Sequence, residues 1–151
     1  MHLTIPSPIG FICIHGNVNT ITALNFSSQK TSDSPAPHAC LRQCARELRE
    51  YFEGRRKTFS VPLEQNGTAF QIQTWQALQK ISFGKTRSYA DIARAIRNPK
   101  AVRAVGSANG KNCIPILVPC HRVITSAGTL GGYSSSVWRK KWLLEHERRY
   151  C

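Results

Sequence analysis

The stretch SYADIARAIRNPKAVRAVGSANGK, residues 88–111, decides how the second half of this chain folds. It opens with Ser88, and Asp91 follows three residues later. This is the spacing of a capping box, in which each side chain accepts a hydrogen bond from the other residue's backbone N–H. The pattern predicts a helix from Tyr89 to about Ile96.

A second start signal follows at once, because Asn98-Pro99 places a capping residue before a proline at the first helical position. It predicts a helix from Pro99 to about Asn109. Two short helices joined by a tight turn make a helix-turn-helix candidate. The residues expected to pack inward recur at helical spacing and are Ala101, Val102, Val105 and Ala108. The opposite stripe consists of Lys100, Arg103, Ser107 and Lys111.

Several residues of this second helix are small, so another backbone can approach it closely. A phosphate strand is one candidate. Tight packing against another helix is the other, and the segment alone does not choose between them.

The remaining pattern divides the chain into two domains, 1–65 and 66–151, with a change of composition at 64–68. The first half predicts a small antiparallel sheet and one helix from the segments 2–6, 10–15, 18–26, 40–52 and, as a further extended piece, 59–63. The second half predicts helices over 70–81 and 136–148 besides the helix-turn-helix. In the last of these, Val137, Trp142, Leu143 and Trp138 are expected to be buried.

Charge is concentrated in the second half. Residues 1–65 carry seven Lys/Arg and five Asp/Glu, net +2, whereas residues 66–151 carry fourteen and three, net +11. A basic field of this kind favours a polyanionic partner, either nucleic acid or an anionic membrane surface. We see no signal peptide and no apolar run long enough to cross a bilayer. The sequence therefore predicts a cytoplasmic protein (nuclear in a eukaryote) whose thiols stay reduced.

A reduced compartment makes one reactive cysteine worth seeking among the six. Cys120 is followed directly by His121. A free thiol has a pKa of roughly 8.5, so a neighbouring imidazole, itself oriented by a carboxylate, is needed to form the thiolate. Glu145, in the last predicted helix, is the expected carboxylate, and Asp91 and Glu147 are its only competitors in this half of the chain. On the dipeptide alone, a structural cysteine remains the favoured alternative.

The other cysteines are expected to pack in the interior. Cys113 reads as a buried residue on the approach to Cys120. Cys40 and Cys44 lie one helical turn apart, and core packing is favoured over a zinc site shared with Cys13, His15 or His38.

The run Pro119-Cys120-His121-Arg122-Val123 resembles the active-site signature of the O6-alkylguanine-DNA alkyltransferases. The resemblance extends over about residues 66–148 in family order and spacing, through Ser88-Tyr89, Asn98-Pro99-Lys100-Ala101, Arg103-Ala104-Val105-Gly106, Asn112, Pro115-Ile116-Leu117-Val118, Tyr133-Ser134 and Trp142-Leu143-Leu144-Glu145-His146-Glu147. It implies an α+β fold: a small N-terminal α/β domain of ribonuclease H-like plan, then a helical domain with a winged helix-turn-helix.

The resemblance also implies roles for single residues. Cys120 would take the alkyl group as a thioether, with His121 as its base through a water and Glu145 orienting His121. Tyr89 would protonate the departing guanine, and Asn112 would tie the helix-turn-helix to the active-site loop. The expected DNA contacts in the minor groove are the finger Arg103 with Lys100, Ala104, Ser107 and Ala108. The expected pocket residues are Pro115 against the alkyl group and Val123, Tyr133 and Ser134 around the base.

The function implied is repair of double-stranded DNA containing O6-alkylguanine, by a monomer that is consumed in one turnover and needs no metal or organic cofactor. Extruding the target nucleotide costs a few kcal/mol, and a planar guanidinium can replace the lost stacking. Three alternatives are less well supported. A lesion-binding relative would lack the cysteine, a regulator would carry more base-reading side chains, and a cysteine hydrolase would need an oxyanion hole.

Overall fold

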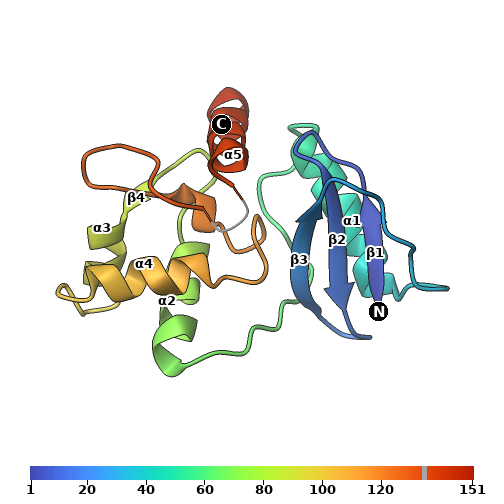
Figure 1. Ribbon diagram of the computed structural model, residues 1–151, viewed down its shortest axis with the longest axis horizontal. Coiled ribbons are helices and arrows are strands. Elements are labelled where there is room, and N and C mark those ends of the chain that lie inside the picture. The colour runs from blue at the N-terminus through green and yellow to red at the C-terminus, as the bar shows by residue number, and fades with distance from the viewer. Residues whose placement is uncertain (134–135) are drawn as a thin grey trace. The chain divides into compact units, whose positions relative to one another are not determined.

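The computed structural model describes residues 1–133 and 136–151, and the chain divides into two compact units, Met1–Gln65 and Asn66–Cys151. The first unit holds an antiparallel sheet in the order β1-β2-β3 and one long helix (Figure 1). Its elements are β1 (His2–Ile5), β2 (Phe11–Gly16), β3 (Ile21–Ser27) and α1 (Ala39–Phe52). The three strands and the helix lie within a few residues of their predicted positions.

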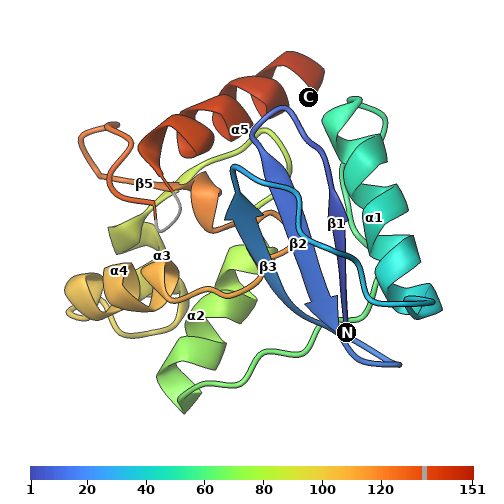
Figure 2. The same cartoon turned by 45° about the vertical axis from the view of Figure 1, so that its right-hand side comes forward.

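Helix α1 packs against the sheet (Figure 2) because one of its faces is apolar. Cys40 and Cys44 belong to this face and are buried, as expected for packing residues. The extended piece near residue 60 also joins the unit, since Ile21 forms a parallel bridge to Leu63. It is tied to α1 by the buried Glu47, whose carboxylate accepts hydrogen bonds from Ser60 N at 2.9 Å and Ser60 Oγ at 2.7 Å.

The second unit is mainly helical. Its elements are α2 (Ala69–Gln79), β4 (Arg87–Ser88), α3 (Tyr89–Ala95), α4 (Val102–Gly110), the 3-10 turn η1 (Cys120–Arg122), β5 (Val123–Ile124) and α5 (Val137–Tyr150). The predicted capping box of Ser88 and Asp91 is present at α3. Helices α2, α3 and α4 pack on one another, which confirms the helix-turn-helix core. The expected wing is reduced to the short parallel pair β4–β5 and the turn after it.

Helix α4 begins three residues later than the Asn98-Pro99 signal predicts. The backbone explains the difference: Ala101 N bonds Asn98 O at 3.0 Å, so these residues form a turn before the helix starts. The buried face of α4 differs from the predicted one at its first residue. Val105 and Ala108 are buried as predicted, but Val102 is exposed.

Three further residues that were expected to be buried are exposed. In α5, Val137 and Trp138 are exposed, and the buried residues are Lys140, Leu143, His146 and Glu147. The helix turns polar side chains inward because, as shown below, they bond the loop that carries Cys120. Cys113 is exposed rather than buried. None of the helices in the described ranges is long and apolar enough to cross a membrane.

Candidate active site

Cys120 stands at the end of a buried, strained loop. Every residue from Ile114 to Val118 is buried, and Ile116 has a φ of 74°. A β-branched residue in the left-handed region is strained by about 1–3 kcal/mol and persists only where its surroundings hold it. The holding contacts are Leu117 N to Pro115 O at 2.9 Å and Val118 N to Ile114 O at 3.0 Å.

Two asparagines fix this loop to the end of α4. Asn112 Nδ2 donates to Val118 O at 2.8 Å, and Asn112 Oδ1 accepts from Ile114 N at 3.1 Å. Asn109 Nδ2 donates to Cys120 O at 3.3 Å. Asn112 therefore lies where the tie between helix and loop was predicted. Asn109 was not predicted; it lies in the last turn of α4, three residues before Asn112, and this spacing is the signal that could have identified it.

The carboxylate beside His121 is Glu147. Glu147 Oε2 lies 2.6 Å from His121 Nε2, and both side chains are buried, at 1% and 0% exposure. The predicted residue, Glu145, is exposed. The prediction of Glu145 is wrong for a geometric reason: two residues along a helix is a rotation of about 200°, so only one of the pair can face the loop.

Arg122 fixes the ionisation of this carboxylate. Its Nε and Nη2 donate to Glu147 at 2.7 and 3.1 Å, and its Nη1 donates to Ile81 O at 2.6 Å. Burial by itself would raise the pKa of Glu147, but His121 and Arg122 hold that pKa well below its usual range. Glu147 is therefore ionised in the fold. Arg122 was expected only as a member of the motif, without a role of its own.

The same burial keeps His121 neutral, because desolvation lowers the pKa of the imidazole even though Glu147 opposes the shift. With Glu147 ionised, the proton of the neutral ring sits on Nε2 and is donated to the carboxylate. Nδ1 is then an unprotonated acceptor. It is buried and has no hydrogen-bond partner among the described residues, so it is poised to receive a proton.

Cys120 is 1% exposed, and burial raises the pKa of its thiol. Hydrogen bonding from Asn112, the charge of Lys140 and hydrogen bonding from Tyr133 lower it in part. The resting group is therefore a thiol, and His121 is its neighbour in the chain.

Lys140 is a buried cation that the sequence analysis missed. Its Nζ donates to Val123 O at 2.6 Å and to Gly132 O at 3.1 Å. Burial lowers the pKa of Lys140 to about 8, against the opposing influence of Cys120. Lysine is seldom fully buried unless it is paired, so the sequence favours an exposed position for it. That Lys140 lies on the inner face of α5 is seen only in the packed helix.

Tyr89 faces the same loop at the start of α3. Burial raises the pKa of its phenol, as does Cys120, while a backbone hydrogen bond with Gly132 acts in the opposite direction. Tyr89 therefore stays protonated at neutral pH and can donate a proton. Gly131 allows this approach, since it has a φ of 69° and a Cβ there would lie 2.9 Å from the Tyr89 hydroxyl.

Of the predicted pocket residues, Tyr133 lines the cavity described next, whereas Pro115 and Val123 are not among the residues that line it. Pro115 and Val123 are buried and Tyr133 is half-buried. Ser134 lies outside the described residues. A cavity of about 230 Å³ is lined by Tyr89, Gly106, Asn109, Gly110, Gly132 and Tyr133.

The predicted DNA contacts occupy one exposed face, with one exception. Lys100, Arg103, Ala104 and Ser107 are exposed. Ala108 is buried at 2% exposure, and its carbonyl accepts from Trp75 Nε1 at 2.9 Å. Its prediction as a groove contact is wrong, because its helical position turns it toward α2.

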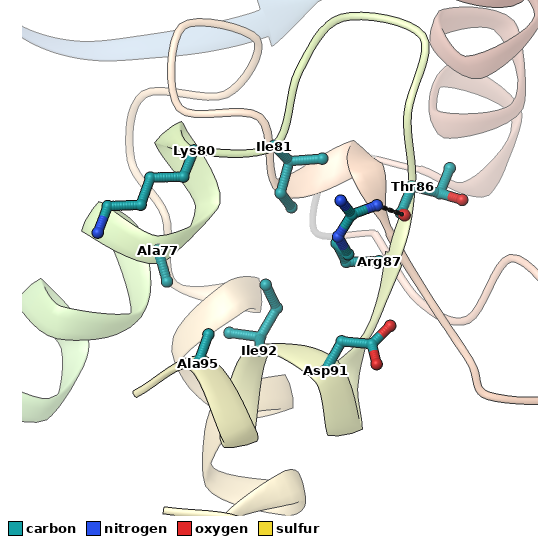
Figure 3. A pocket seen from close by; sticks show the side chains of 8 residues that line it. All are labelled: Ala77, Lys80, Ile81, Thr86, Arg87, Asp91, Ile92 and Ala95. Carbon is teal, nitrogen blue, oxygen red and sulfur yellow. Dashed lines mark hydrogen bonds between the residues drawn. The ribbon is translucent and has the colours of Figure 1, made fainter. Parts of the chain in front are cut away.

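Another cavity, of about 540 Å³, lies apart from this centre, between α2, β4 and α3. Figure 3 shows Ile81 and Ile92 pointing toward the same space, with Arg87 turned to the carbonyl of Thr86. Neither a thiol nor an imidazole lines it. It therefore lacks the thiol and the imidazole of the candidate site, which belong to the loop beside the smaller cavity.

Comparison with known proteins covers both units. Residues 69–149 match the family model "6-O-methylguanine DNA methyltransferase, DNA binding domain", and residues 1–65 match its "ribonuclease-like domain". The constitutive methylated-DNA–protein-cysteine methyltransferase of Bacillus subtilis is 46% identical, over 97% of this chain and 94% of that protein. The methylated-DNA–protein-cysteine methyltransferase of Methanosarcina acetivorans is 44% identical over 93% of this chain and 94% of its own.

Solved structures agree. The OGT of Mycobacterium tuberculosis in complex with DNA superposes with a TM-score of 0.91 at 41% identity, covering 99% of this chain and 94% of that one. An O6-methylguanine DNA methyltransferase from Methanococcus jannaschii superposes with a TM-score of 0.70 at 26% identity, over 97% and 93%. With both units matched, and with the thiol, imidazole and carboxylate assembled, the chain belongs to the 6-O-methylguanine DNA methyltransferase family.

Proposed function

We propose that this chain repairs DNA by direct reversal, moving the alkyl group of O6-alkylguanine onto Cys120 in a single turnover. The observation that carries the proposal is the buried set Cys120, His121 and Glu147, in which a thiol adjoins a neutral imidazole whose Nε2 is bonded to an ionised carboxylate. The relatives named as methylated-DNA–protein-cysteine methyltransferases support the same reaction.

The reaction balances with the groups described. His121 Nδ1 takes the proton of Cys120, directly or through a water, and the sulfur attacks the alkyl carbon. As the new C–S bond forms, the bond between that carbon and O6 breaks, and its electron pair passes to the guanine. Tyr89 donates a proton to the departing base. The thioether keeps the alkyl group, so the protein is consumed.

Glu147 serves as a positioning residue in this scheme. It holds the Nε2–H tautomer of His121 and stabilises the imidazolium that forms when Nδ1 is protonated. Arg122 keeps the carboxylate ionised. Lys140, beside Cys120, favours the thiolate while its amine is charged.

DNA binding is assigned to residues 66–151. The exposed face of α4 carries Arg103 and the small side chains Ala104 and Ser107, which suit the minor groove better than bulky ones. Arg103 would fill the gap left by the extruded nucleotide. Phosphate contacts from the basic unit carry little sequence information, which suits a search for damage in any sequence. The protein would act where the DNA is, in the cytoplasm of a bacterium or the nucleus of a eukaryote.

The test is the intact mass of the protein after incubation with duplex DNA that carries one O6-methylguanine. We expect a gain of one methylene unit, once per molecule, mapped to Cys120 by peptide analysis. Cys120→Ser should bind the duplex and gain no mass, whereas the matched variant Cys113→Ser, at an exposed cysteine, should react like the wild type. A folded, reduced wild-type protein that gains nothing would overturn the proposal.

A further inference from the structure

Helix α5 carries a ring at every fourth position, and the four residues are Trp138, Trp142, His146 and Tyr150. Residues four apart lie one above another on a helix, so the rings form a ridge inclined to the helix axis. From Trp138 to Tyr150 it rises by about 18 Å. The Trp142 and His146 rings are stacked, with centroids 4.9 Å apart and planes at 14°, and the His146 and Tyr150 centroids lie 5.0 Å apart. We call this row the aromatic ridge.

The two ends of the aromatic ridge are open to water. Trp138 is 53% exposed and Tyr150 is 36% exposed, whereas His146 is buried. Between these ends lies a hollow of about 310 Å³, whose lining residues are Trp142, Glu145, His146 and Arg149. Exposed rings beside a hollow are typical of a surface that binds a partner.

A guanidinium covers the ring at each end of the ridge. The Cζ atom of Arg139 lies over the Trp138 ring, 4.7 Å from its centroid, and that of Arg149 lies over the Tyr150 ring at 5.4 Å. A cation in this position is attracted by the face of the ring. Each end therefore presents an apolar ring and a positive charge together.

The outer surface of α5 is strongly basic. Its exposed and half-exposed cations are Arg139, Lys141, Arg148 and Arg149. Among the described residues, Lys141, Arg148 and Arg149 form no ion pair with a carboxylate. Glu145 is the exposed acid of the helix, since Glu147 is buried against Arg122. This balance is complementary to a polyanion.

Rings and cations in one row fit an unpaired nucleic acid strand. Its bases stack on aromatic side chains and its phosphates are held by the cations. In a duplex the faces of the bases already cover one another, so exposed rings gain little from it. An anionic membrane also attracts cations, but it needs an apolar face along the helix. The exposed large apolar residues of α5 lie only at its ends, Val137 and Trp138 at one and Tyr150 at the other.

We propose that the aromatic ridge of α5 binds single-stranded DNA, with bases stacked on Trp138 and Tyr150 and phosphates held by Arg139 and Arg149. The surface is separate from the duplex contacts assigned to α4, because the whole ridge belongs to a different helix. The inference goes beyond the proposed alkyl transfer and does not depend on it.

The test titrates the protein with a labelled oligothymidylate, which does not pair with itself, and in parallel with an undamaged duplex. Binding is followed by fluorescence anisotropy of the label. Stacking should also quench the tryptophan fluorescence, and because Trp75 is buried, the quenching reports Trp138 and Trp142. We expect Trp138→Ala to lower the affinity for the single strand about tenfold, the size of one stacked base, and to leave the affinity for the duplex unchanged.

Val137→Ala is the matched control, because it changes the neighbouring exposed apolar residue without removing a ring, and it should bind as the wild type does. Lys100→Ala, on the face assigned to the duplex, should weaken duplex binding and spare the single strand. Glu145→Gln removes the exposed acid and should raise the affinity for the single strand. Arg149→Ala should lower the slope of log affinity against log salt by about 0.7 for the single strand.

The inference is overturned if Trp138→Ala binds the oligothymidylate as tightly as the wild type does. An equal loss of affinity for single strand and duplex would also overturn it, since α5 would then belong to the duplex interface. So would a blue shift of the tryptophan fluorescence on phosphatidylserine vesicles combined with no response to the oligothymidylate, which would assign the ridge to a membrane surface. The proposed alkyl transfer is measured separately, by the mass of the protein, and stands or falls on that result.

Discussion

Glu147 and Glu145 lie two residues apart on α5, and replacing each by alanine should have very different consequences. Glu147 is 1% exposed and accepts from Arg122 Nε at 2.7 Å and Nη2 at 3.1 Å, from Gly84 N at 3.3 Å and from His121 Nε2 at 2.6 Å. Its removal leaves a buried guanidinium without a counter-charge, which costs about 3–5 kcal/mol. Removal of the exposed Glu145 should change the free energy of unfolding by less than about 0.5 kcal/mol.

The assay is urea unfolding followed by tryptophan fluorescence. All the tryptophans, Trp75, Trp138 and Trp142, belong to the unit Asn66–Cys151, so the signal reports that unit. With a urea m-value of about 1–1.5 kcal/mol/M for a small domain, Glu147→Ala should lower the midpoint by about 2–5 M. Glu147→Gln, which keeps the volume and one acceptor, should fall between Glu147→Ala and the wild type.

The same variants test the site. Glu147→Ala and Glu147→Gln should slow alkyl transfer, because His121 loses the partner that fixes its tautomer, while Glu145→Ala should react at the wild-type rate. Equal effects of the two alanine substitutions on stability, or a loss below about 1 kcal/mol for Glu147→Ala, would refute the assignment of the buried carboxylate.

Four other outcomes are expected from the geometry. Arg103→Ala should slow repair in duplex DNA more than the reaction with free O6-alkylguanine base, since only the duplex needs the finger; equal slowing would remove that role. Lys100→Ala should weaken binding to all duplex sequences alike and lower the slope of log affinity against log salt by about 1, measured by titration at several salt concentrations. Lys140→Met should slow transfer below a pH of about 8 and match the wild type above it, because the Lys140 amine, with its pKa of about 8, is neutral at higher pH. A ratio of variant to wild-type rates that does not change with pH would show that this charge does not support the thiolate of Cys120. The folded pKa of Glu147 lies below its unfolded value of about 4.3, so its contribution to stability is present above that pH and is lost as the pH falls toward the folded value. Wild-type urea midpoints should therefore fall between about pH 5 and pH 3 by more than those of Glu147→Gln. Parallel curves for the two proteins would contradict the lowered pKa of Glu147.

Local signals in the sequence predicted much of this structure. The capping box of Ser88 and Asp91 marks the start of α3 because both of its hydrogen bonds join residues three apart. The apolar face of α1 and the alternation of the N-terminal strands are likewise local patterns. Cys120 and His121 were identified as a pair because they are adjacent in the chain.

The wrong carboxylate and the wrong burial predictions in α5 share one cause: the direction in which a side chain points depends on what its helix packs against. Nothing in the order of residues distinguishes Glu145 from Glu147, and the choice follows from the rotation of α5 against η1. Val137 and Trp138 were expected inside because they are apolar, yet the inner face of α5 carries Lys140 and Glu147.

By itself, the sequence determined the family signature, the adjacent pair Cys120 and His121, and the basic second half, because each is a matter of residue identity and spacing along one chain. Only the tertiary structure decided the rest: that Glu147 meets His121, that Arg122 keeps the carboxylate ionised, that Lys140 is buried beside the thiol, and that Asn109 bonds the carbonyl of Cys120. Each of these features depends on the burial of a side chain. Burial is produced by the packing of the helices, and the order of residues alone does not specify it.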